Sequence, residues 1–185
     1  PAAAPVSSAP KAAPAGAPKS RPAAAKPATA AAKRPEGTHP AYRAGLAALA
    51  AAARREGSAA AAPAGGVRVE AADGDAVLSV SVGPDGVVAD ARHEGASGEL
   101  KGALEGLCDL LPGRTFQEGH DHAAIRLEAR LRDAGAPPPV TGLLTPRNAD
   151  PAFVRPLAIL RAAYKKWLAQ REAKPGWNFW DDRPG

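Results

Sequence analysis

Side chains that could carry out chemistry are few in this chain of 185 residues. Cys108 is its single cysteine, and the segment His120-Asp121-His122 holds two of its four histidines. That segment suggests a metal site, but residues two apart on a helix point to different sides, so the two histidines are poorly placed to share one ion. A zinc site made from Cys108, His122 and Asp75 would need ligands from distant parts of the chain, whereas zinc ligands usually lie closer in sequence. We therefore expect no bound metal, and we expect Cys108 to be a buried apolar residue.

The remaining polar residues do not suggest an enzyme. His39 and His93 are isolated in the sequence and are expected to lie in solvent. The sequence has no glycine-rich loop of the kind that holds phosphates in P-loop and dinucleotide-binding proteins. No set of serine, histidine and aspartate suggests nucleophilic catalysis. The expected protein is not an enzyme, and its role has to come from binding.

The positive charge of the chain is concentrated near its N-terminus. Residues 1–66 hold nine lysines and arginines against two glutamates, which gives this part a net charge of +7. Because the whole chain has a formal net charge of +5, the remaining residues carry a net charge of −2. Residues 1–37 are mostly Ala, Pro and Lys, a composition that cannot build a core and predicts a disordered tether. A plain linker is the favoured interpretation; a nucleic-acid-binding tail and the remnant of a transit peptide are the alternatives.

Cysteine content and hydropathy constrain the compartment. One cysteine excludes a disulfide within the chain, so nothing in the sequence indicates an oxidising compartment. No apolar run approaches the roughly 18–20 residues that span a bilayer. We expect a cytoplasmic protein without a membrane span; the alternative is an organelle matrix after removal of a transit peptide.

Residues 38–57 have the pattern of an amphipathic helix, with Thr38 as its N-cap and Pro40 in its first turn. Tyr42, Leu46 and Leu49 fall on one face of that helix. Two interpretations stay open: the helix packs on its own body, or it docks into the groove of a partner protein. Residues 58–66 are expected to be a linker.

Residues 67–173 predict a domain of three strands followed by helices. Strands are expected over 67–71, 76–82 and 87–91, with Ser79 and Ser81 on the solvent face of the second. Helices are expected over 98–111, 116–133 and 156–173, the last beginning at Pro156 because proline disrupts a longer helix. The predicted fold class is α+β, a three-stranded antiparallel meander with helices packed on one face.

The last segment, residues 174–185, is an aromatic tail. Three of the chain's few aromatic residues fall within four positions, Trp177, Phe179 and Trp180, and Asp181-Asp182 follows them. The tail either folds back on the body or anchors in a partner, since aromatic residues dominate interface hot spots.

The order of these motifs resembles the NifU/IscU family of iron–sulfur cluster scaffold proteins. The run Val87-Val88-Ala89-Asp90-Ala91-Arg92 resembles the family's strand that ends in Asp-Ala-Arg, and Gly113-Arg114-Thr115-Phe116-Gln117-Glu118 resembles its Gly-Lys-Ser/Thr-Leu-Asp/Glu-Glu segment. Pro138-Pro139-Val140-Thr141 resembles the segment before its last helix. The resemblance covers nearly the whole of residues 67–173.

The resemblance also implies a cluster pocket that has lost its ligands. The family binds its cluster through three cysteines, because thiolates suit iron–sulfur clusters. The first position falls at Asp73, with Asp75 matching a family aspartate, the second near Ser97, and the third near Leu143 or Leu144. None of them is cysteine, so the resemblance implies a scaffold-like fold without a cluster.

Three functions follow in order of preference. The first is a non-enzymatic interaction or structural subunit of a larger assembly, such as a redox enzyme complex, with Tyr42, Leu46, Leu49 and the aromatic tail as docking residues. The second is an iron–sulfur assembly scaffold or accessory factor working with that machinery. The third, a nucleic-acid-associated protein using its basic arm, is the least expected.

Overall fold

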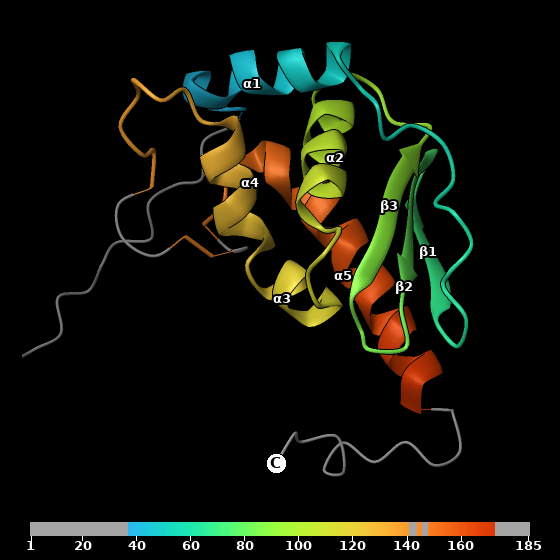
Figure 1. Ribbon diagram of the computed structural model, residues 1–185. Coiled ribbons are helices and arrows are strands. Elements are labelled where there is room, and N and C mark those ends of the chain that lie inside the picture. Colours follow the sequence, from blue (N-terminus) through green and yellow to red (C-terminus); the bar gives the residue numbers. More distant parts are fainter. Residues whose placement is uncertain (1–36, 141–143, 146–147, 173–185) are drawn as a thin grey trace, which may run out of the picture. The chain divides into compact units, whose positions relative to one another are not determined.

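The computed structural model describes residues 37–140, 144–145 and 148–172, which form an α+β body (Figure 1). Its elements in chain order are α1 (Pro40–Ala51), β1 (Val67–Asp73), β2 (Ala76–Val82), β3 (Val88–Glu94), α2 (Gly98–Leu110), α3 (Phe116–Asp121), α4 (Ala123–Leu131) and α5 (Pro151–Glu172). The predicted class, a three-stranded antiparallel meander with packed helices, is confirmed. None of these helices is both long and apolar enough to cross a membrane.

The sheet has the order β1-β2-β3, with both pairs antiparallel. Asp73 pairs with Ala76, so the turn between β1 and β2 consists of Gly74 and Asp75 alone and is shorter than the predicted turn over 72–75. Leu78, Val80 and Val82 of β2 are fully buried, as their alternation in the sequence predicts. α5 packs on β1 and β2 and α2 packs on β3, so these two helices cover one face of the sheet (Figure 1).

Helix α1 packs on the body of its own chain, which is one of the two interpretations that the sequence leaves open. Tyr42 and Leu46 are each 1% exposed, and Leu49 packs at the edge of the same core. The Tyr42 ring lies against Phe153 of α5, with 4.9 Å between ring centroids. α1 also contacts α2 and α4, so burial of Tyr42 and Leu46 against the body stabilises the fold.

The start of α1 also differs from the prediction. His39, not Thr38, is the N-cap, and its side chain accepts a hydrogen bond from the amide of Ala41. The helix ends at Ala51, before the predicted end at residue 57. His39 is exposed, as expected.

A strap, residues 54–60, runs from α1 along β3 and across the second face of the sheet. The amide of Gly57 donates to the carbonyl of His93 at 2.9 Å, and the amide of Ala59 donates to the hydroxyl of Ser79 at 2.7 Å. Ser81 donates its hydroxyl proton to the carbonyl of Ala60. Ser79 and Ser81 are therefore almost fully buried, and their predicted place in solvent is wrong because the strap covers them. Residues 58–60 of the predicted linker belong to this strap.

The predicted helix over 116–133 is divided into α3 and α4 at His122, whose backbone angles are φ −102° and ψ 5°. The division lets α3 pack on α5 while α4 packs on α1 and α2. The predicted apolar face of α4, Ala124, Leu127 and Leu131, is buried.

Helix α5 is longer than predicted, because Pro156 lies inside it and not at its start. Asp150 caps the helix, with its carboxylate accepting from the amide of Ala152 at 2.9 Å and from the amide of His39 at 2.8 Å. Pro156 removes one backbone donor early in the helix. Its ring is buried on the inner face of α5, and this burial offsets the missing hydrogen bond.

Candidate functional site

Three of the five positions that the resemblance assigns to a cluster pocket lie in neighbouring segments at one end of the body: Asp73, Asp75 and Ser97. Gly95, in the loop between β3 and α2, lies directly against the backbone of Asp75 in the β1–β2 turn, and its φ is +68°. A Cβ atom on Gly95 would lie 1.9 Å from the Asp75 carbonyl oxygen, so only glycine fits there. Ser97 follows as the N-cap residue of α2. The chain fold therefore brings the β1–β2 turn close to the start of α2.

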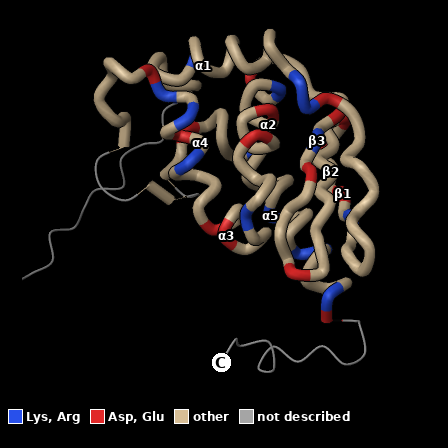
Figure 2. Tube along the Cα trace, viewed as in Figure 1, with Lys and Arg blue, Asp and Glu red and all other residues tan. Residues whose placement is uncertain are grey.

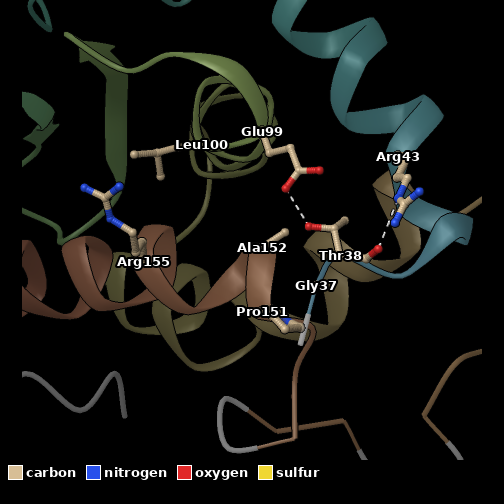
Figure 3. Close-up of a pocket in the computed structure, with 8 residues that line it drawn as sticks. All are labelled: Gly37, Thr38, Arg43, Glu99, Leu100, Pro151, Ala152 and Arg155. Carbon is tan, nitrogen blue, oxygen red and sulfur yellow. Dashed lines mark hydrogen bonds between the residues drawn. The ribbon is translucent and has the colours of Figure 1, made fainter. Parts of the chain in front are cut away.

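A cleft of about 460 Å³ opens beside this end, between the first turns of α1, α2 and α5 (Figure 3). Arg43 of α1 and Arg155 of α5 lie on opposite sides of it, and Glu99 and Leu100 come from α2 (Figure 3). Gly37, Thr38, Pro151 and Ala152 complete the lining. Two guanidinium groups, one carboxylate and one apolar side chain make a surface suited to a polar segment of another molecule.

Hydrogen bonds hold the cleft in shape. Thr38 donates its hydroxyl proton to Glu99 over 2.5 Å, and Arg43 Nε donates to the carbonyl of Thr38 over 3.2 Å (Figure 3). These bonds tie the residues before α1 to α2. Glu99 is thus occupied by a hydroxyl donor, and no histidine or cysteine lines the cleft in the part of the chain that the structure describes. The cleft therefore presents two guanidinium groups and one carboxylate to a bound molecule.

Asp73 is held by an ion pair. Arg155 Nε lies 2.8 Å from Asp73 Oδ2, and Arg155 Nη2 donates to the Asp73 carbonyl at 3.2 Å. Arg155 therefore connects the first position of the predicted pocket with the cleft. Asp75 is exposed beside it.

These residues do not fit an iron–sulfur cluster. The described positions supply two carboxylates, Asp73 and Asp75, and the hydroxyl of Ser97, whereas such clusters are held by thiolates. Leu144 is a half-buried apolar residue packed against the core and does not line the cleft. Leu143 lies outside the described residues, as do Trp177, Phe179 and Trp180.

Cys108 cannot supply the missing thiolate. It is fully buried in the core on α2, as predicted. Burial raises the pKa of its thiol well above the usual value, and the negative charge of Glu105 raises it further. The thiol therefore stays protonated and enclosed.

The histidine segment gives no metal site either. The His120 ring stacks on Tyr164, with 4.5 Å between centroids, and its Nδ1 lies 2.9 Å from Asp121 Oδ1. His122 Nδ1 lies 3.3 Å from the carbonyl of Glu118 instead. Across residues 37–140, 144–145 and 148–172, no three His, Cys, Asp or Glu side chains are grouped closely enough to hold a metal ion.

His93 is buried, so its predicted place in solvent is wrong. It is 1% exposed, and its Nε2 lies 2.9 Å from Oε2 of Glu105, which is itself 2% exposed. Glu105 also accepts from the amides of Arg54 and Arg55 at the start of the strap. Alternation along β3 could have indicated that His93 shares a face with buried Ala91, but the partner on α2 is set by the tertiary fold.

The charges of the body are mixed in sign. Figure 2 shows Lys and Arg interspersed with Asp and Glu along the described helices and strands. Comparison with protein-family models gave no match, and comparison with curated proteins gave none either.

Proposed function

We propose that this protein is a non-enzymatic interaction or structural subunit of a larger assembly, such as a redox enzyme complex. Its body would be a degenerate relative of NifU/IscU-type scaffolds that no longer holds a cluster. The observation that carries the proposal is the set of residues at the end of the body where the β1–β2 turn lies beside the loop before α2: Asp73, Asp75 and Ser97. Asp73 there pairs with Arg155 and no described residue offers an accessible thiolate.

The cleft beside this end is the proposed contact with the partner. Arg43 and Arg155 can donate several hydrogen bonds each, and Leu100 offers apolar area between them. Arginine is enriched at interface hot spots, where it pairs with carboxylates and backbone carbonyls. α1 supports the cleft from within the chain, because its apolar face is buried.

Affinity capture of the full chain from its native source tests this proposal. The wild type is compared with an Arg43→Glu/Arg155→Glu double variant and with a control, Arg130→Glu, whose arginine is also well exposed but lies on α4. We expect one or more defined subunits in stoichiometric amounts, identified by mass spectrometry, with the wild type and the control but not with the double variant. Circular dichroism checks that all three proteins are folded.

Two outcomes would overturn the proposal. A stable monomer that recovers no stoichiometric partner would exclude a structural subunit. Iron and sulfide bound after anaerobic reconstitution, together with recovery of a cysteine desulfurase, would favour the assembly scaffold instead.

A further inference from the structure

A second concave surface lies on another part of the body, where the end of α3 and the start of α4 face α5. This α4–α5 groove holds a pocket of about 180 Å³ lined by His120, Asp121, Ala124, Leu157, Leu160 and Arg161. The only large apolar side chains that are exposed in the described part of the chain are Ile125, at 42%, and Val154, at 38%. Val154 lies one turn before Leu157 and two turns before Arg161 on α5, so it is on the side of this helix that borders the groove.

We infer that the α4–α5 groove is the docking site of this chain's own C-terminal segment, residues 174–185, with Trp180 in the pocket and Asp181-Asp182 beside Arg161. The groove offers an apolar wall for an aromatic ring, and the stacked rings of His120 and Tyr164 adjoin it. Aromatic side chains gain more from such a pocket than other residues because they bury a large area with few rotatable bonds.

The length of the segment matches the distance to the groove. Leu160 and Glu172 are twelve residues apart on α5, so the pocket lies about 18 Å back from the end of the helix. Trp180 is eight residues beyond Glu172, and eight extended residues span about 27 Å, which leaves room for a reversal of direction. Pro175-Gly176 is a dipeptide typical of turns and stands where the chain must reverse.

The charges match as well. Arg161 lines the pocket, and Lys165, one turn further along α5, is exposed on the same side. Asp181 and Asp182 would lie beside this pair of positive charges. The acidic group on the opposite wall, Asp121, contacts His120, with 2.9 Å between His120 Nδ1 and Asp121 Oδ1.

A paramagnetic label on the full-length chain tests the inference. Ala158→Cys, an exposed position on α5 next to Leu157, receives a nitroxide, and the buried Cys108 stays unlabelled. We expect the ¹⁵N indole signal of Trp180 to be lost through broadening by the label. A label at exposed Ala48→Cys on α1, at the far end of the body from the end of α5 (Figure 1), should leave that signal intact.

A groove variant and a mixed sample make the test decisive. Val154→Asp should restore the Trp180 signal in the labelled chain, whereas Ala44→Asp on the exposed face of α1 should not. Broadening that appears only when labelled protein is mixed with ¹⁵N protein lacking a label would assign the groove to a second copy and overturn the inference. A Trp180 signal that no label at 158 affects would overturn it too.

None of these outcomes bears on partner capture by Arg43 and Arg155, so the proposed function is tested separately.

Discussion

At the scale of single residues, the contact between Glu105 and His93 joins α2 to β3. A buried carboxylate is strongly destabilising unless donors surround it. Glu105 receives the amides of Arg54 and Arg55, with the shortest contact at 2.7 Å, in addition to the His93 ring. One side chain of α2 thereby fixes β3 and the first residues of the strap.

We predict that Glu105→Gln lowers the free energy of unfolding by about 3 kcal/mol, because the amide offers one acceptor oxygen where three donors converge. Asp109→Asn is the matched control: it lies one turn later on α2 and also contacts Arg55, but it is one-third exposed and should change stability by less than about 1 kcal/mol. Urea unfolding followed by circular dichroism measures both values. An equal loss of unfolding free energy in the two variants would show that Glu105 contributes no more to stability than the exposed Asp109.

At the scale of elements, the close contact between α1 and α2 depends on a glycine. A Cβ atom at Gly102 of α2 would lie 2.1 Å from the carbonyl oxygen of Leu46 on α1. The backbones of the two helices therefore approach closely at this point, and Tyr42 and Leu46 reach the core because of that approach. Side-chain volume at one position thus controls the placement of a whole helix.

Gly102→Ala should lower the free energy of unfolding by about 2 kcal/mol through overpacking. The expected destabilisation is opposite in sign to the effect of helix propensity, which favours alanine over glycine by about 1 kcal/mol. The control is Gly37→Ala, where a new Cβ would meet nothing within 4 Å. Thermal unfolding of both variants gives the comparison, and a stabilised Gly102→Ala protein would show that the helices can separate without penalty.

At the scale of the whole molecule, the core is assembled from both ends of the described chain. Tyr42 near the start contacts Phe153 near the end, and the strap from α1 covers the sheet face that α2 and α5 leave open. Removing α1 would uncover α2, α4 and part of α5 together. The body is therefore expected to unfold as one cooperative unit.

Truncation at two points checks this expectation. A chain that lacks residues 1–36 should keep the free energy of unfolding of the full chain, because the core described here begins after them. A chain that lacks residues 1–53 also loses Tyr42 and Leu46, each of which contributes about 1.5–3 kcal/mol by burial, and should lose cooperative unfolding. Chemical denaturation measures both. A cooperative transition in the shorter chain would show that α1 is an accessory to the body.

Much of the fold follows from local pattern. Alternation gave β2 its bounds, Ala76–Val82, and leucine spacing placed α2 within a residue of its end. The burial of Cys108 was also predictable, because it lies beside the leucine stripe of α2. These predictions succeed because each depends on hydrogen bonds and apolar faces within a few residues of the chain.

The remaining features depend on tertiary contacts. The sequence by itself determined the order of the three strands, the α+β class and the lack of cysteine at the expected ligand positions. Only the tertiary structure decided that Tyr42 and Leu46 face inward, that Ser79 and Ser81 lie under the strap, and that His93 meets Glu105. The physical reason is that a polar residue can be buried when a partner satisfies its hydrogen bonds, and that partner comes from a distant part of the chain that periodicity does not reveal.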